Sequence, residues 1–210
     1  MAQKDLFATV EPVLPDIGPN ATIAALAEEA AQCTRCDLYK WATQTVFGAG
    51  PPDARVMMVG EQPGDQEDLQ GLPFVGPAGQ LLDRALEEAG VDRGDVYVTN
   101  AVKHFKFEAR GKRRIHKKPD RPEIEACRWW LERELAVVKP DLVVALGGTA
   151  GQAIHGRAVK VMSERGTIGD DPRGFRVLLT VHPSYLLRLC DAAAKEREYL
   201  AFVADLKLAA

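Results

Sequence analysis

Residues 57–79 read MMVGEQPGDQEDLQGLPFVGPAG, and they join an apolar segment to a long stretch of glycine, proline and acidic residues. The apolar run at 55–59 predicts a β-strand that ends at Gly60. A helical pattern returns only near Gly79, so we expect irregular chain between these two glycines. Open α/β folds bind ligands in the loops that follow the carboxyl ends of their strands. The stretch therefore predicts the fold class and the position of the functional site together.

Three further apolar segments predict strands, and helical patterns lie between them. The strands are expected at 95–99, 141–146 and 176–181, and the helices at 23–32, at 78–89, from Pro122 onward and at 193–208. Strands that alternate with helices form a parallel sheet covered on both faces. The sequence thus predicts an α/β fold, a three-layer α/β/α sandwich with a four-stranded parallel sheet. Residues 21–210 are expected to form a single domain, and the proline-dotted residues 1–20 a flexible N-terminal arm.

The charge of the chain is distributed unevenly. The 210 residues carry a net charge of −3, yet residues 103–121 contain nine Lys or Arg and only two acidic residues. Such a basic segment in an otherwise acidic chain favours a polyanionic partner.

Several classes of protein are disfavoured by the sequence. We expect no membrane association and a cytoplasmic location, because neither a signal-peptide pattern nor a membrane-length apolar run is found. The four cysteines are then expected to be free or metal-bound. The glycine-rich turns match neither a P-loop nor a dinucleotide fingerprint, so we expect no nucleotide cofactor. A monomer is expected.

Polar side chains follow three of the predicted strands. Glu61 and Asp65 come after the first strand, Asn100 after the second and His182 after the fourth. These strand ends meet at one edge of a parallel sheet, where an amide and an imidazole can hydrogen-bond a planar heterocycle and Phe74 can stack on it. The alternative is that Asn100 caps a loop and that Phe74 only packs.

Four segments of the sequence agree in order and spacing with one family, the iron–sulfur uracil-DNA glycosylases called family 4. The segments are GEQPG at 60–64, GLPFVGPAG at 71–79, TNAVK at 99–103 and VHPSYLLR at 181–188. The chain departs from family 4 at Gln62, where that family has Ala, and in an additional loop, GKRRIH at 111–116. The KRRIH sequence of this loop resembles the signature of the UdgX branch, whose members become covalently attached to the DNA on which they act. The resemblance implies a fold like that of uracil-DNA glycosylases.

The resemblance also implies a reaction and the residues that perform it. The protein would excise uracil from DNA, with single-stranded DNA preferred, release free uracil, and bond His116 to C1′ of the deoxyribose. The implied uracil-binding residues are Gly60, Gln62, Phe74, Asn100 and His182. The implied catalytic residues are His116, Glu61, His182 and Asp65, and spacing leaves open which task falls to Glu61, Asp65 or Asp68. The implied DNA-binding residues are Lys112, Arg113, Arg114, Lys117 and Arg188, and Lys103, Lys106 and Lys118 are expected to contact phosphates as well.

A [4Fe–4S] cluster is the cofactor that the resemblance implies. Cys33 and Cys36 have the spacing that lets two thiolates bind one cluster, and Cys127 matches a further ligand of the family. Family 4 takes the remaining ligand from a Cys at the position of His104, so His104 is the expected fourth ligand. Cys190 is the alternative. The cluster is expected to have a structural role.

Two other functions remain possible from the sequence. A conventional family 4 enzyme would excise uracil with multiple turnovers, and its basic loop would only grip phosphates. A non-catalytic nucleic-acid sensor would bind DNA through the same loop and release no uracil.

Overall fold

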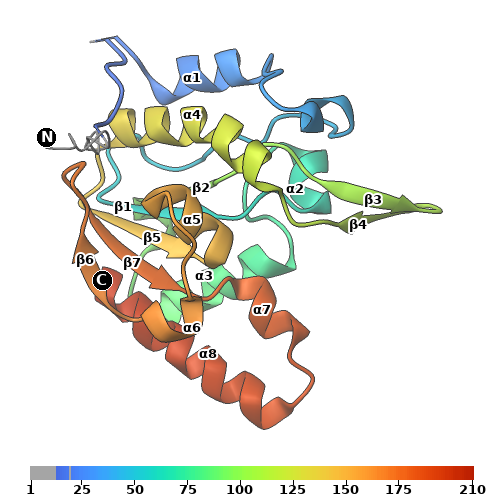
Figure 1. The fold of residues 1–210 in the computed structure, drawn as a ribbon. Helices are drawn as coiled ribbons and strands as arrows, with labels where there is room; N and C mark the ends of the chain where they lie inside the picture. The colour runs from blue at the N-terminus through green and yellow to red at the C-terminus, as the bar shows by residue number, and fades with distance from the viewer. Residues whose placement is uncertain (1–12, 19) are drawn as a thin grey trace, which may run out of the picture.

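A five-stranded sheet forms the centre of the molecule and helices cover both of its faces (Figure 1). The computed structural model describes residues 13–18 and 20–210. The strands lie in the order β2-β1-β5-β7-β6. Their bounds are β1 Val56–Gly60, β2 Val96–Asn100, β5 Leu142–Leu146, β6 Ile168–Asp170 and β7 Arg176–Thr180. The α/β sandwich is confirmed, and so are its four parallel strands.

The fifth strand, β6, was not predicted. It pairs antiparallel with β7 at the edge of the sheet, and it has only three residues, Ile-Gly-Asp. A segment so short and so poor in apolar residues gives no periodic pattern, which is why the sequence predicted four strands instead of five.

The parallel strands are apolar throughout because both of their faces are buried. Met57 and Val59 of β1 face one core with Tyr97, Val143 and other side chains. The second core lies on the opposite face and contains the alternate strand residues, among them Met58. The sheet therefore separates two hydrophobic cores.

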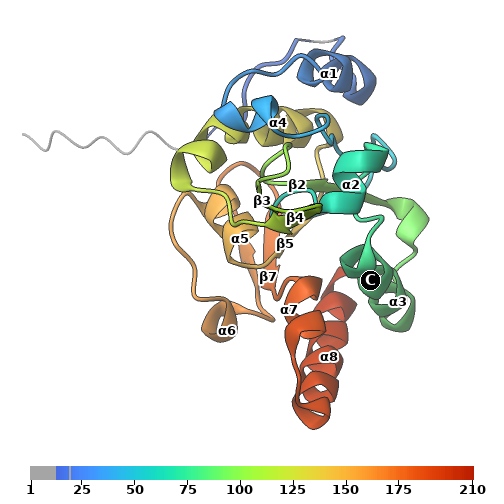
Figure 2. The ribbon, with the colours of Figure 1, turned by 90° about the vertical axis from the view of Figure 1, so that its right-hand side faces the viewer.

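Each core is closed by its own set of helices, which lie on opposite sides of the sheet in Figure 2. The first core is covered by α1 Ile23–Ala30, α4 Arg121–Val138 and α5 Gly148–His155. The second is covered by α3 Pro77–Ala89, α7 Pro183–Arg188 and α8 Ala192–Leu206. The remaining helical segments are η1 Asp37–Lys40, η2 Arg93–Asp95, α6 Val161–Glu164 and η3 Lys207–Ala209. The helices expected at 23–32, 78–89, from Pro122 and at 193–208 are thus confirmed, with small shifts at their ends.

Two segments expected to be irregular are ordered. The stretch after Gly60 contains a short helix, α2 Asp65–Gln70. The additional basic loop is a β-hairpin, in which β3 Phe107–Arg110 pairs antiparallel with β4 Arg113–His116. The hairpin projects from the body of the molecule beside α2 (Figure 1). His116 consequently lies at the end of a strand, at the base of the hairpin.

Most of the expected N-terminal arm, residues 1–20, lies outside the described residues. In the part of the chain that the structure describes, no helix is both long and apolar enough to cross a membrane.

Candidate active site

A cavity of about 750 Å³ opens at the carboxyl ends of the parallel strands. The predicted site residues that line it are Glu61, Gln62, Asp65, Phe74, Asn100, His116, His182 and Arg188. The cavity lies where the connections from the two neighbouring strands β1 and β5 run in opposite directions along the sheet, which is the usual ligand position in open α/β folds. The structure therefore brings together the strand ends that the sequence predicted to share one cleft.

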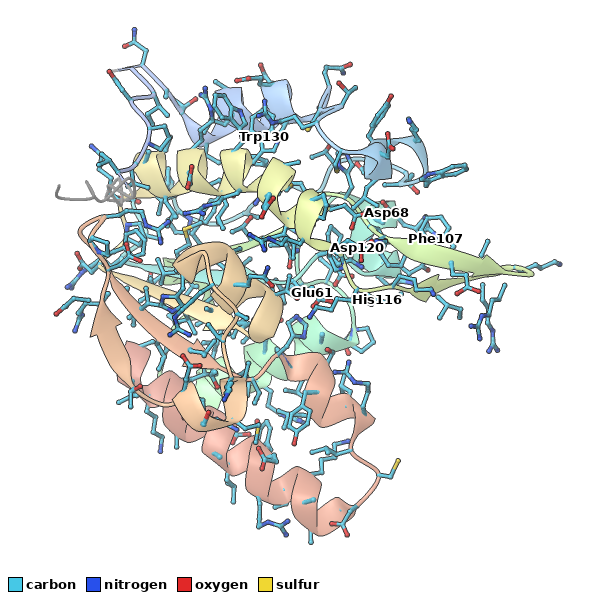
Figure 3. The ribbon with its side chains drawn as sticks, in the orientation of Figure 1. Glu61, Asp68, Phe107, His116, Asp120 and Trp130 are labelled. Carbon is cyan, nitrogen blue, oxygen red and sulfur yellow. The ribbon has the colours of Figure 1, made fainter. Side chains whose placement is uncertain are left out.

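His116 and Glu61 lie next to each other in the lining of this cavity (Figure 3). Nε2 of His116 lies 3.5 Å from Oε1 of Glu61, and the second oxygen of Glu61 accepts a hydrogen bond from the hydroxyl of Thr149. Burial lowers the pKa of His116, Glu61 acts in the opposite direction, and the nearby charge of Arg188 lowers it further. The imidazole is therefore neutral at neutral pH, while 49% of the side chain stays exposed.

His182 is held in one tautomer by its own helix. It is the N-cap of α7, and its Nδ1 accepts a hydrogen bond from the backbone N–H of Ser184 at 3.1 Å. Burial, followed by the charges of Arg188 and His116, lowers the pKa of His182 to about 4. Because Nδ1 is an acceptor in a neutral ring, the proton resides on Nε2, which is free to donate to a ligand.

The hydroxyl of Ser184 supports this arrangement. Its oxygen lies 2.8 Å from Nδ1 of His182 and accepts a hydrogen bond from Arg188 at 3.0 Å. The hydroxyl of Ser184 therefore donates its proton to Nδ1 of His182, as the backbone N–H of Ser184 does. The sequence did not single out Ser184 or Thr149, although each lies within three residues of a predicted strand end.

An aromatic ring and an amide complete the wall of the cavity. Phe74 stacks against His182 with 6.1 Å between ring centroids and 28° between planes, and its φ of 58° is unusual for a non-glycine residue. Asn100 is buried, and its side-chain amide makes no hydrogen bond within residues 13–18 and 20–210. Gly60 allows both to approach, because a Cβ at this position would lie 2.7 Å from Cζ of Phe74 and closer still to Oδ1 of Asn100.

Gln62 closes the base of the hairpin. Its Nε2 donates to the carbonyl oxygens of Lys106 at 3.1 Å and Lys117 at 3.0 Å, and its Oε1 accepts from the N–H of Lys106 at 3.1 Å. The amide is thus used to join the two ends of the segment that carries His116.

Arg114 fastens the same hairpin to α2. It donates to Asp65 at 2.6 Å and to the fully buried Asp68 at 2.5 Å. Its guanidinium also lies over the rings of Phe105 and Phe107, at 5.4 and 5.2 Å from their centroids. The two aspartates therefore engage Arg114, and Glu61 is the acid beside His116.

The other lysines and arginines expected to bind DNA near the hairpin differ in how exposed they are. Lys112, Arg113, Lys117 and Lys118 are exposed along the hairpin and beyond it, with Lys117 paired to Glu108 at 3.0 Å. Lys106 pairs with Asp120 and Glu123. The phosphate contact expected of Lys103 is wrong, because its ammonium group is completely buried.

Comparison with known proteins agrees with this geometry. The profile described as Uracil DNA glycosylase superfamily matches residues 47–207. The chain belongs to this superfamily. One relative of the chain is the Type-4 uracil-DNA glycosylase of Thermotoga maritima. It is 40% identical over 164 residues, which cover 78% of this chain and 82% of the relative. The Type-4 uracil-DNA glycosylase of Pyrobaculum aerophilum is 36% identical over 174 residues, with coverages of 78% and 83%. A Type-5 uracil-DNA glycosylase of the same organism is 34% identical over 164 residues, with coverages of 65% and 64%.

The residues expected to bind a cluster in this superfamily member lie beside α1 and α4. Cys33 and Cys127 are buried, and each sulfur accepts a hydrogen bond at 3.1 Å, from the indole N–H of Trp130 and the backbone N–H of Lys103 respectively. The pKa of the Cys127 thiol is raised to about 12, mainly by burial, and Cys36 and Cys33 are close enough to contribute to that rise. The three sulfurs therefore belong to one neighbourhood.

His104 has a free ring nitrogen in a buried position. Its Nε2 lies 2.9 Å from the hydroxyl of Thr45, whereas its Nδ1 is buried and has no hydrogen-bond partner in the described part of the chain. Across the same residues, no three His, Cys, Asp or Glu side chains converge closely enough to hold a single metal ion. A four-iron cluster needs one donor at each of four separate irons, so three thiols and an unpartnered imidazole fit it as a donor set.

Cys190 occupies a different region. It is exposed on the connection between α7 and α8, on the opposite side of the sheet from α1 and α4 (Figures 1 and 2). This placement favours His104 as the fourth donor.

Proposed function

We propose that the protein is a uracil-DNA glycosylase of the UdgX type, which excises uracil from DNA and then remains bonded to the deoxyribose through His116. One observation carries the proposal. His116 comes from a hairpin outside the sandwich, yet it lines the same cavity as Asn100 and His182 and lies 3.5 Å from Glu61. A histidine that served only to grip phosphate would have no reason to line the same pocket as the groups that can bind a base.

Recognition of the extruded uracil falls to three side chains. Phe74 offers a ring face for stacking, and Asn100 offers both a donor and an acceptor to the imide edge. The neutral His182 would donate from Nε2 to O2 of the base. Cleavage of the N-glycosidic bond leaves negative charge on the departing uracil, and a donor aimed at O2 stabilises that charge as it develops.

His116 would then meet the sugar. As the bond between C1′ and uracil N1 breaks, its electron pair leaves with uracil, which later takes a proton from solvent. The lone pair of the neutral imidazole forms a new bond to the electron-poor C1′. The alkylated ring becomes positively charged until it loses its remaining N–H proton, and the carboxylate of Glu61 offsets that charge.

The hairpin must be held still for this attack. Gln62 ties its two ends together and Arg114 fastens it to Asp65 and Asp68. Reactions between groups that are fixed at short range are much faster than those between mobile groups. These contacts would therefore contribute to bond formation at C1′ more than to uracil release.

A [4Fe–4S] cluster would be held by Cys33, Cys36, His104 and Cys127. When bound it would supply cross-links and no redox step, since glycosidic cleavage transfers no electrons to or from the protein. It would link the two cysteines after α1 and His104 after β2 to Cys127 on α4. DNA outside the pocket would be gripped by Lys112, Arg113, Lys117 and Arg188 through phosphate contacts.

A conventional glycosylase with multiple turnovers is the second candidate. Identities of 36–40% to Type-4 uracil-DNA glycosylases favour it. In that case His116 would only help to bind DNA.

Counting the uracil released per protein molecule distinguishes the two candidates. With excess deoxyuridine oligonucleotide, the unmutated protein should release one equivalent and stop, and His116→Ser should release many. Sustained turnover by the unmutated protein would reject the covalent step and leave the glycosylase. No uracil release from either protein would reject both and support a binding protein.

A further inference from the structure

A fully buried ion pair lies directly behind the wall of the cavity. The ammonium of Lys103 is bonded to the carboxylate of Glu134, and neither side chain has any exposed surface. Lys103 follows β2, and Glu134 lies on the inner face of α4. Neither residue lines the cavity, and neither has a part in the proposed chemistry.

Glu134 has a complete set of partners. Its Oε1 accepts hydrogen bonds from the hydroxyls of Tyr97 and Thr99, both at 2.9 Å, and from the N–H of Gly48 at 3.1 Å. Its Oε2 receives Lys103. Burying two charges costs desolvation, and such a pair is often no more stabilising than apolar residues of the same volume. Stability alone therefore does not account for it.

The other bonds of the ammonium group point to a second role. Nζ of Lys103 donates to the backbone carbonyl of Asn100 at 2.7 Å and to the hydroxyl of Thr99 at 2.6 Å. Asn100 is the last residue of β2, and its side chain enters the cavity. On the other side of the peptide, the N–H of Ala101 donates to the carbonyl of Gly60 at 2.9 Å.

These contacts fix the plane of the peptide that joins Asn100 to Ala101. With the carbonyl held by Lys103 and the N–H held by Gly60, the backbone of Asn100 has little freedom to rotate. The direction of its Cα–Cβ bond follows from the backbone, and the backbone also limits the rotamers that place its amide. A bond to a charged donor is among the stronger ways to hold a carbonyl.

We infer that Lys103 is a positioning residue for base recognition, and that Glu134 balances its buried charge. The bond from Lys103 to the backbone carbonyl of Asn100 sets the amide of Asn100 at the angle that the imide edge of uracil requires. The inference rests on the proposed function, in which Asn100 reads that edge. Lys103 also donates its backbone N–H to the sulfur of Cys127, so the same residue contacts a proposed cluster ligand.

Two variants separate positioning from charge balance. Lys103→Met with Glu134→Gln removes the donor to Asn100 while leaving no unpaired charge, and the Gln oxygen still accepts from Tyr97, Thr99 and Gly48. Glu134→Gln alone breaks the ion pair and keeps the donor. The measurement is inhibition by free uracil, which occupies only the base pocket, together with the single-turnover excision rate at saturating protein.

The double variant should bind free uracil about tenfold or more weakly and excise at a correspondingly lower rate, since it loses a charged hydrogen bond behind the reading group. Glu134→Gln alone should stay within about threefold of the unmutated protein in uracil inhibition, because its donor remains. Unchanged uracil inhibition in a folded double variant would overturn the inference. So would an equal loss in both variants.

A matched control accounts for general loss of stability. Arg165→Met breaks another poorly exposed ion pair, with Asp205 on α8, far from Asn100. It should lower the melting temperature without changing uracil inhibition. Iron content of all variants should stay constant, and a parallel loss of iron and uracil affinity would overturn the inference in favour of an effect through the cluster. If the double variant does not fold, a tenfold loss of uracil affinity in folded Glu134→Gln overturns it.

Failure of the positioning role can be distinguished from failure of the proposed function. If Asn100→Ala abolishes excision while the Lys103 variant is unaffected, the positioning role alone fails. If the unmutated protein neither releases uracil nor is inhibited by it, the proposed function itself is wrong.

Discussion

His116 and Glu61 reach each other from two separate parts of the fold, with 3.5 Å between Nε2 and Oε1. Glu61 follows β1, an interior strand of the sheet, and His116 ends the second strand of a hairpin that projects from the sandwich. The carboxylate is itself held by Thr149 after β5. The proposed nucleophile therefore lies on a two-stranded hairpin that is hydrogen-bonded at its base to Gln62, two residues after β1.

Replacement of Gln62 should uncouple bond formation from uracil release. Gln62→Ala removes three hydrogen bonds between Gln62 and the backbone at the two ends of the hairpin. We expect covalent attachment to slow by about tenfold, with excision changed by less than about threefold, because the base pocket keeps its stacking and reading groups. Rapid-quench gels for the adduct and for cleaved strand measure the two rates.

Gln80→Ala, on the exposed face of α3, is the control for this experiment and should change neither rate. Equal slowing of both steps by Gln62→Ala would show that the amide serves the base pocket instead of the hairpin.

Covalent attachment should depend on pH through His116. Only the neutral imidazole is nucleophilic, and burial together with Arg188 holds its pKa below the ordinary value of 6.5. The midpoint of attachment should therefore lie below pH 6.5, and attachment should fall at more acidic pH as the ring gains a proton. Arg188→Ala removes one of the groups that lower this pKa, so the acidic fall should begin at higher pH.

The comparison for Arg188 is Arg113→Ala, which removes an exposed positive charge at the start of β4, next to the turn of the hairpin. At saturating protein it should leave the pH profile in place. A profile that shifts equally in both variants would contradict the assignment of the acidic limb to His116.

A methyl group at Gly60 should damage the base pocket. Gly60→Ala places its Cβ 2.7 Å from the ring of Phe74 and against the amide oxygen of Asn100, so one of them must move. Overpacking of this kind costs roughly 1–3 kcal/mol, and we expect excision to fall about tenfold or more. Gly169→Ala, where a Cβ meets nothing within 4 Å, is the control. Normal excision by Gly60→Ala would mean that Phe74 and Asn100 do not read the base.

Iron content should follow the proposed donor set. Cys127→Ser and His104→Ala should lower the iron bound per protein and weaken the visible absorption, since each removes one of four donors. Cys190→Ser should retain both. Retention of iron by His104→Ala with loss in Cys190→Ser would transfer the fourth position to Cys190.

The fold could be predicted largely because buried parallel strands are apolar on both faces. The runs at 55–59 and 141–146 have this property in their interiors, and they correspond to β1 at 56–60 and β5 at 142–146. The hairpin was not predicted, because each of its strands has only four residues and half of those residues are charged, so the apolar pattern is too short to indicate a strand. Helix α2 was missed because six mostly polar residues among glycines resemble a loop.

The cavity residues were predictable from strand ends, but their bonds to one another were not. A count of charges treats every lysine as exposed. It therefore predicted that Lys103 contacts a DNA phosphate, whereas its side chain is fully buried. A signal was present in the sequence. Glu134 lies among Leu131 and Leu135 on the apolar face of α4, and an acid in such a position requires a buried partner.

The most direct test is a denaturing gel of the protein mixed with a single-stranded oligonucleotide that contains one uracil, run after boiling in SDS. The account predicts a band at the summed mass of protein and DNA. The band should be absent with thymine in place of uracil, and absent with His116→Ser, which should still leave an alkali-labile site. Alkali-labile DNA without any shifted band from the unmutated protein would contradict the account, and would make His116 a DNA contact of an ordinary glycosylase.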